Sequence, residues 1–144
     1  MYNIGRVFMF RVPEDNDLLE YLNAFALENK IDTAWVNVIG SLKDIELGYY
    51  DTFAEEYLIN RFNGFYELVA GVGNISLRDG KPFTHLHVVI GDRTGRAYTG
   101  HLIKAKVYVA EAFIVEILGE PKLVRERVGR KLWLWKPYRL EEFK

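Results

Sequence analysis

The sequence has no cysteine among its 144 residues. This absence excludes disulfide bonds, thiol nucleophiles and every metal site that uses thiolate ligands. Histidine is scarce as well, with three residues, and the chain has only four prolines. Histidine and carboxylate side chains are therefore the remaining strong ligands for a transition metal.

Long apolar runs are also missing. No stretch approaches the ~20 apolar residues of a membrane-spanning helix, so we expect no membrane partner. The first residues, MYNIGRVFMFRVPED, carry Arg6 and Arg11 among the apolar positions and lead to no small-residue cleavage site. We therefore expect no secretory signal and a cytoplasmic location.

The chain is instead rich in apolar and aromatic residues. Hydrophobic residues make up 49% of it, and nine Phe, nine Tyr and three Trp are among them. A chain of this size buries about two-thirds of the surface that its unfolded state exposes. We therefore predict one domain over residues 1–144 that folds without disulfides or a structural metal.

Hydrophobic periodicity predicts one helix and many strands. A first strand covers residues 4–12, and the helix follows, with Asp17 and Glu20 as a capping-box-like start and Lys30 at its end. The later segments alternate with period two, which is typical of strands. They cover residues 34–39, 45–50, 57–62, 66–72, 83–90, 97–103 and 107–118.

Short turns separate these segments. Asn63-Gly64, Asp79-Gly80 and Asp92–Gly95 are typical of hairpin connections, which join antiparallel strands. No helical segment lies between the strands to make parallel crossovers. The predicted fold class is therefore α+β, with a mostly antiparallel β-sheet.

All three histidines lie within seventeen residues of each other, at His85, His87 and His101. His85 and His87 share one face of a strand because they are two residues apart. If the following turn is an odd-length loop centred on Thr94, His101 lies opposite His87 on the next strand. A two-residue loop would instead place His101 opposite Leu86 and turn it to the other face. Gly95 is typical of a three- to five-residue loop and favours the odd-length loop.

Three neutral imidazoles on rigid strands, with no obvious fourth protein ligand, are typical of an open site for a divalent metal, zinc or a similar ion. We therefore predict a metal site at His85, His87 and His101. The alternative is that these are ordinary strand histidines with backbone and hydroxyl partners.

Fewer signals point to other functional side chains. Arg78 is a candidate for attracting an anion or orienting a ligand, although a solvated loop explains it equally well. Glu67, Glu111 and Glu116 lie inside apolar strands, where a carboxylate must be paired or face a cavity. Glu67 and Glu111 are thus candidates to orient a ligand, and no residue is assigned as catalytic.

The C-terminal segment 121–144 is the basic part of the chain, with eight Lys and Arg against three Glu. It also carries Trp133, Trp135, Tyr138 and Phe143. Basic residues interleaved with aromatic residues can bind nucleic acid. The favoured interpretation is a strand or extended arm that packs on the body of the domain or on a neighbouring subunit.

The run from Gly64 to Gly119 resembles the plants-and-prokaryotes-conserved (PPC) domain family. The resemblance is carried by Gly71-x-Gly73-Asn74-Ile75-Ser76, Gly80-Lys81-Pro82-Phe83-Thr84-His85-Leu86-His87, Gly95 and Gly100-His101-Leu102. It implies an α+β domain with one or two helices, assembled as a homotrimer. It also implies a fold relationship to acetolactate decarboxylase, which holds zinc with a similar His-x-His plus later His pattern; its reaction is not transferred.

Plant members of this family place the domain after an AT-hook, which this chain lacks, and contact partners through a Gly-Arg-Phe-Glu-Ile-Leu segment. The counterpart here keeps the Gly and the Glu but has Phe65 in place of the Arg. The resemblance therefore makes Phe65, Tyr66, Glu67 and Leu68 candidate partner contacts. Prokaryotic relatives are often described as predicted DNA-binding proteins, which makes DNA a partner to consider.

Three functions follow from these observations. The first is a homotrimer with a three-histidine site for a divalent metal, suited to binding or transforming a small molecule; the chemistry of its ligands favours zinc. The alternative is a DNA-binding or transcription-regulatory scaffold that uses the basic C-terminal segment. The third is an assembly module with partner contacts at 65–68.

Overall fold

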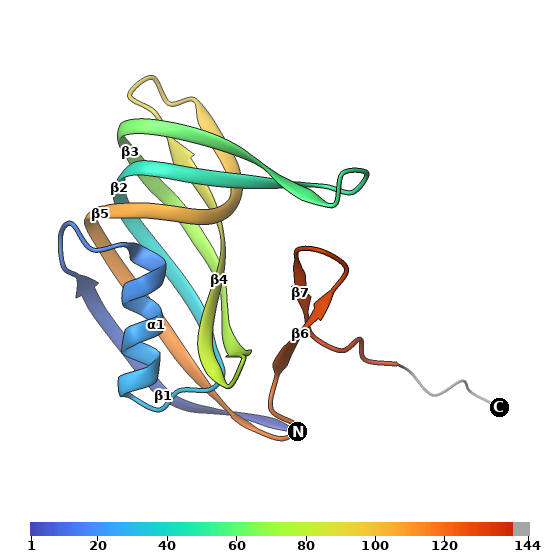
Figure 1. Cartoon of the computed structure of the whole chain (residues 1–144). Helices are drawn as coiled ribbons and strands as arrows, with labels where there is room; N and C mark the ends of the chain where they lie inside the picture. Colours follow the sequence, from blue (N-terminus) through green and yellow to red (C-terminus); the bar gives the residue numbers. More distant parts are fainter. Residues whose placement is uncertain (140–144) are drawn as a thin grey trace.

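The structure, a computed structural model, describes residues 1–139 of the chain (Figure 1). Its elements in chain order are β1 (Tyr2–Val12), α1 (Leu18–Glu28), β2 (Ala34–Asp51), β3 (Glu56–Arg78), β4 (Lys81–Gly91), β5 (Ala97–Gly119), β6 (Val124–Val128) and β7 (Leu132–Leu134). The α+β class predicted from the sequence is confirmed.

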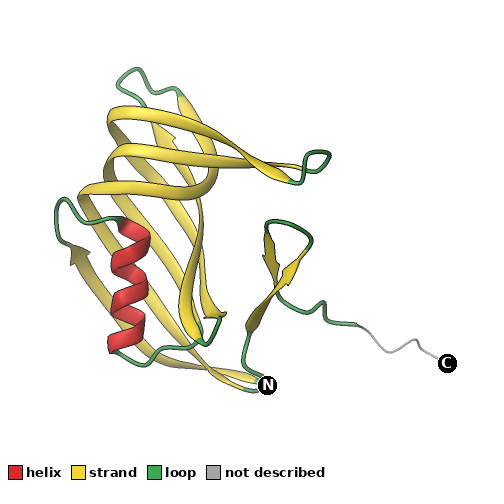
Figure 2. Ribbon diagram, in the orientation of Figure 1, coloured by secondary structure: helices red, strands yellow, loops and turns green. Residues whose placement is uncertain are grey.

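The sheet is antiparallel apart from one short pairing and closes on itself. Its strand order is β1-β5-β2-β3-β6-β7, and β4 pairs with both β3 and β5. The exception is β6, which runs parallel to β3 over two residue pairs. Figure 2 shows the helix lying against the strongly curved sheet, with the β6–β7 hairpin on the other side.

Several strands are longer than the sequence predicts. Segments 34–39 and 45–50 are both parts of β2, and 57–62 and 66–72 are both parts of β3. The prediction of a hairpin turn at Asn63-Gly64 is wrong. Phe62 pairs with Ile45 and Phe65 with Lys43, so Asn63 and Gly64 form a bulge in a continuous strand. Gly64 fits that bulge because its φ of +84° is a backbone conformation that favours glycine.

The predicted turn at Asp79-Gly80 is confirmed. Arg78 pairs with Lys81 across it, and both turn residues have positive φ, 51° at Asp79 and 75° at Gly80. Two successive positive φ values are the signature of the two-residue turn that suits twisted antiparallel strands. This turn starts β4 in the register that places its histidines.

The helix begins as the sequence predicts. Asp17 caps it by accepting a hydrogen bond from the Glu20 backbone N–H at 3.0 Å, and its second oxygen accepts one from Ala105 of β5 at 3.1 Å. Leu18 and Leu22 are fully buried against the sheet. Among residues 1–139, no helix is long and apolar enough to cross a membrane.

The interior of the curved sheet is the hydrophobic core. On β4, Leu86, Val88 and Ile90 point into it and are at most 1% exposed. Because side chains alternate along a strand, the residues between them face outward. Gly73 on β3 allows a close approach at this place, since a Cβ atom there would lie 1.8 Å from the His85 carbonyl oxygen.

The basic C-terminal segment packs on the body around β6 and β7, whereas Tyr138 beyond them is 91% exposed. The Trp135 indole N–H donates to the buried Ser76 hydroxyl at 3.0 Å, and Lys122 forms an ion pair with Asp32. The predicted packing arm is thus observed at β6 and β7. Phe143 and the rest of 140–144 lie outside the described residues.

An ion pair between Arg6 and Glu116 links β1 to β5. A bulge in β1 near Gly5 turns Arg6 toward Glu116 of β5, and the guanidinium donates to both carboxylate oxygens at 2.7 Å. Arg6 also donates to the carbonyl of Asn29, the residue that ends the helix, at 2.9 Å. Glu116 is 6% exposed, so this pair accounts for its burial inside an apolar strand.

Hydrogen bonds from Arg6 lower the pKa of Glu116 below its ordinary value of 4.5. A carboxylate with a lowered folded-state pKa stabilises the fold above the unfolded pKa, and this contribution is lost as the pH falls through the folded pKa. We expect Glu116→Gln to melt a few degrees below the original protein at pH 7. The gap should narrow steadily as the pH is lowered below 4.5.

Melting curves followed by circular dichroism between pH 3 and pH 7 measure this gap. Glu111→Gln is the matched control, because Glu111 is an exposed carboxylate on the same strand. A gap for Glu116→Gln that stays constant over this pH range would contradict the assignment.

Candidate metal centre

The three histidines lie on one hairpin. β4 and β5 pair in the register that the odd-length loop centred on Thr94 requires, with His87 directly opposite His101. The predicted register is therefore confirmed, and the loop spans residues 92–96. His85 lies two residues before His87, on the same outward face of β4.

The three imidazoles converge. Ring centroids are 5.0 Å apart for His85 and His87, 4.9 Å for His85 and His101, and 5.6 Å for His87 and His101. Each ring offers one nitrogen, and these three atoms lie within 4.8 Å of one another. The group is compact enough for a single ion to reach a nitrogen of each ring.

Their protonation suits metal binding. Burial first, then the neighbouring His101, Arg125 and His87, lowers the pKa of His85 to about 4. Burial first, then the neighbouring His87 and Arg125, lowers the pKa of His101 to about 4 as well. Both rings are therefore neutral near pH 7, which is the form that ligates a metal.

The ring nitrogens differ in their partners. His101 Nδ1 is buried and has no hydrogen-bond partner within residues 1–139. His85 Nδ1 lies 3.4 Å from a terminal nitrogen of Arg125. A guanidinium can only donate, so His85 accepts in this contact. The ring of Tyr57 stacks on His101 at 5.1 Å between centroids, and burial raises the pKa of this tyrosine.

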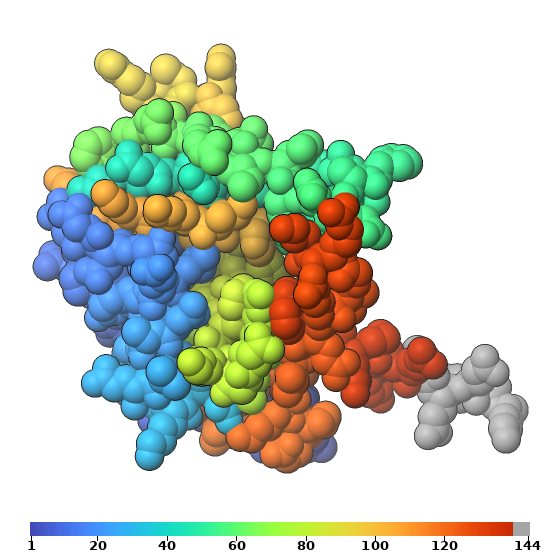
Figure 3. Space-filling view, viewed as in Figure 1, coloured from blue at the N-terminus to red at the C-terminus, as the bar shows by residue number. Residues whose placement is uncertain are grey.

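Beside the histidines is a pocket of about 150 Å³. Its walls come from β3, from the start of β4 and β5, and from the β6–β7 hairpin, which Figure 3 shows packed against the body of the molecule. The lining residues are Tyr57, Arg78, Phe83, His85, His101, Arg125, Lys131, Leu132, Trp133 and Leu134. The structure therefore brings the predicted residue Arg78 to the histidines.

Arg125 is the residue that sequence reasoning missed. It lies on β6 directly beside Arg78 of β3, and it is 7% exposed. Burial and then the charge of Arg78 lower its pKa, yet a guanidinium stays charged at pH 7. No local signal distinguishes Arg125 from the exposed Arg127 two residues later, because its burial arises from long-range packing.

The other candidate ligand-orienting residues lie elsewhere. Glu67 is exposed and pairs with Gly91, four residues along β4 from His87, which corresponds to roughly 13 Å. Glu111 is exposed in the register of Arg11. The structure does not bring either carboxylate to the three imidazoles.

The candidate partner contacts differ in accessibility. Phe65 is 61% exposed and Glu67 is exposed, so both are free to meet another molecule. Tyr66 packs on Phe62, with ring centroids 5.6 Å apart, and is half-buried. Leu68 is only 2% exposed because it points into the core. A partner cannot reach Leu68 in this fold, so that part of the prediction is corrected.

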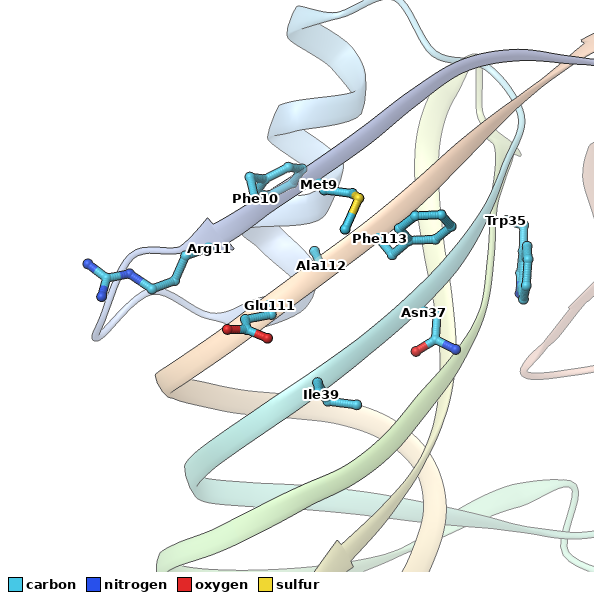
Figure 4. Close-up of a pocket in the computed structure, with 9 residues that line it drawn as sticks. All are labelled: Met9, Phe10, Arg11, Trp35, Asn37, Ile39, Glu111, Ala112 and Phe113. Carbon is cyan, nitrogen blue, oxygen red and sulfur yellow. The ribbon is translucent and has the colours of Figure 1, made fainter.

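A larger hollow of about 650 Å³ lies on the outer face of β1, β5 and β2. Met9, Trp35 and Phe113 are among its apolar lining residues, and Met9 is 75% exposed. Figure 4 shows Met9 and Phe113 on the side of the sheet that faces away from the helix. Contiguous apolar surface of this kind is typical of an interaction surface.

Comparisons with known proteins give the chain's relatives. A PPC protein from Pyrococcus horikoshii is 41% identical, covers 97% of each chain and superposes with a TM-score of 0.94. A metal-containing protein from Archaeoglobus fulgidus is 32% identical, covering 95% of this chain and 97% of its own, with a TM-score of 0.88. No curated protein matches the sequence.

A third solved structure, of a suspected DNA-binding protein from Bacteroides thetaiotaomicron, is 24% identical over 94% of this chain and 98% of its own. Its TM-score is 0.79, and at this identity it shows the fold alone. The family model of the Plants and Prokaryotes Conserved (PCC) domain matches residues 1–118. The resemblance carried by the histidine and glycine motifs is thereby confirmed, and the chain belongs to the Plants and Prokaryotes Conserved domain family.

Proposed function

We propose that the chain binds a divalent metal ion, zinc, through His85, His87 and His101, and that the ion serves to bind or transform a small molecule. The observation that carries this proposal is the convergence of one nitrogen from each ring within 4.8 Å. Three histidines can lie on one face of a hairpin by chance without their ring nitrogens coming this close together.

The residues fit the ion. His101 Nδ1 is a buried nitrogen without a partner among the described residues, and an unpaired buried polar atom costs free energy that a metal bond would offset. Three imidazoles form the whole group of candidate ligands within residues 1–139. Zinc with three protein ligands keeps a coordination position for water or a ligand, which is typical of catalytic sites and not of closed structural sites.

The relatives support a metal as well. The protein from Archaeoglobus fulgidus is metal-containing by name, and this chain covers nearly all of it at 32% identity. A bound divalent ion supplies Lewis acidity or a lowered pKa for a water molecule. The chain's own residues would hold that ion, leave an approach past the exposed His87, and provide cationic side chains beside it. We assign no catalytic residue.

We expect the purified chain to bind one zinc ion per chain at pH 7. The triple variant His85→Ala/His87→Ala/His101→Ala should bind zinc at least about a hundredfold more weakly, since even groups that only orient metal ligands are worth tenfold to hundredfold. Calorimetric titration and elemental analysis measure both proteins.

Thr99→Ala is the matched control for this experiment, because Thr99 lies two residues from His101 on the same face of β5. It should keep full zinc affinity. Equal zinc binding by the triple variant, or no binding by the original protein, would rule out the proposed centre.

Self-association is the second part of the proposal. The outer face of β1, β5 and β2 exposes Met9, Trp35 and Ile39, each at least 49% accessible. We infer that a second copy of the chain packs on this face. The family resemblance implies that the assembly is a homotrimer. A cytoplasmic location stays a prediction.

We expect light scattering after gel filtration to give three times the mass of one chain. Met9→Glu/Ile39→Glu should reduce the mass to that of one chain, because two buried carboxylates without partners disfavour association. Leu27→Glu is the control, since Leu27 is 58% exposed on the helix, away from this face. A single-chain mass for the original protein would contradict the trimer.

DNA binding is the alternative function, because the name of the relative from Bacteroides thetaiotaomicron suggests it. The structure gives that function little charge to use. In the described part of segment 121–144, Lys122, Arg130 and Lys136 form ion pairs with carboxylates, and Arg125 is buried. The segment is therefore engaged largely with the chain itself.

We accordingly expect no DNA binding of the kind that phosphate contacts produce. Gel-shift titrations of a duplex at 50 and 200 mM salt measure this. A protein with six to ten phosphate contacts loses about 10³- to 10⁵-fold in affinity over this range. Tight binding at 50 mM with such a loss at 200 mM would favour the alternative over the small-molecule site.

A further inference from the structure

Positive charge gathers at the pocket beside the histidines without carboxylates to balance it. Arg78, Arg125 and Lys131 all line the pocket. Its lining includes no acidic side chain within residues 1–139, and none of the three cations forms an ion pair with a carboxylate there. Like charges held together in this way are costly unless an anion joins them.

Arg125 is the fixed centre of this charge. It donates to the Asn74 side chain at 2.7 Å and to the Trp133 carbonyl at 3.1 Å, and it is 7% exposed. Its Nε is buried without a partner in the described part of the chain. The third contact, to His85, is long at 3.4 Å. The guanidinium is thus held in place with donors to spare.

The neighbouring walls are apolar. Phe83, Leu132 and Trp133 line the same pocket, and Arg78 lies over the Trp133 ring at 4.1 Å and the Phe83 ring at 4.9 Å. The volume of about 150 Å³ corresponds to roughly five water molecules. A ligand for this pocket therefore carries one anionic head and a short apolar body.

We propose that the pocket binds a small organic carboxylate, with its carboxylate group on Arg125 and Arg78 and its hydrocarbon part against Phe83 and Trp133. Guanidinium groups match carboxylates in geometry and charge. Phosphate shares the anionic chemistry but has no apolar body for these walls. This inference deepens the proposed function and rests on it for the role of the ligand, because the pocket adjoins the three imidazoles.

The metal and the anion should strengthen each other's binding. A neutral imidazole has one in-plane lone pair, which His85 directs at Arg125 in this structure. An ion held by His85 would use that lone pair, so the Arg125 N–H that now points at His85 would be left without an acceptor. Metal binding therefore frees Arg125 for a carboxylate, and the coupling must act equally in both directions.

The test is calorimetric titration of the full chain with butyrate, with and without one equivalent of zinc. Butyramide serves as the uncharged analogue of the same shape, and inorganic phosphate as the anion without an apolar body. We expect butyrate to bind at least about tenfold more tightly than either, and zinc to tighten it further. Arg125→Gln should weaken butyrate binding about ten- to hundredfold, as the loss of a charge-assisted pair predicts.

Arg127→Gln is the matched control, because it removes the same charge two residues along β6. Within residues 1–139, the Arg127 side chain donates only to the Arg130 carbonyl. If Arg125→Gln fails to fold, as judged by circular dichroism, Arg78→Gln tests the same pocket and should lose at least about tenfold. Butyrate binding that equals butyramide binding, that phosphate matches, or that survives both pocket variants would overturn the inference.

The zinc titration of the same samples separates this inference from the proposed function. Zinc binding without butyrate binding would refute the proposed carboxylate pocket and support the proposed metal centre. Butyrate binding that depends on Arg125 in a chain that takes up no zinc would support the pocket and refute the centre. The triple histidine variant should bind butyrate with no response to zinc.

Discussion

The candidate centre depends on the length of one loop. Between β4 and β5, one Asp92 carboxylate oxygen accepts hydrogen bonds from the Thr94 backbone, the Thr94 hydroxyl and the Arg96 backbone, at 2.6–3.0 Å. The Asp92 backbone N–H donates to the Arg96 carbonyl at 2.9 Å. These bonds fix a five-residue loop and with it the pairing of His87 with His101. A shift of one residue would turn a whole strand face from solvent to core.

Local features of this fold could be predicted from the sequence, and long-range ones could not. The Asp17 helix start, the Asp79-Gly80 turn and the histidine register each depend on residues close together in the chain. The Asn63-Gly64 turn was wrongly predicted because only the neighbouring strand decides between a turn and a bulge. Arg125 was missed for the same reason, since a strand that pairs with β3 from far along the chain buries it.

The apolar hollow and the three histidines lie on the same outer face of the sheet. Trp35 of β2 pairs with Asn74 of β3, and Asn74 pairs with His85 of β4, so all three lie in one row across neighbouring strands. Strands are about 4.8 Å apart, which places the apolar hollow roughly 10 Å from the histidines. A second chain that covered Trp35 would therefore border the candidate metal centre and restrict how a ligand enters it.

Arg125 lies on β6, so during synthesis it emerges after the hairpin that carries the three histidines. A ribosome makes the chain from its N-terminus, so the β4–β5 hairpin with all three histidines emerges before β6 and β7. Hairpin pairing closes a short loop at little entropic cost, whereas docking the last hairpin joins residues that are distant in sequence. The imidazoles are thus assembled while their pocket still lacks a wall. A divalent ion that bound at this stage would reach three imidazoles still open to solvent, and β6 and β7 would afterwards close the pocket beside them.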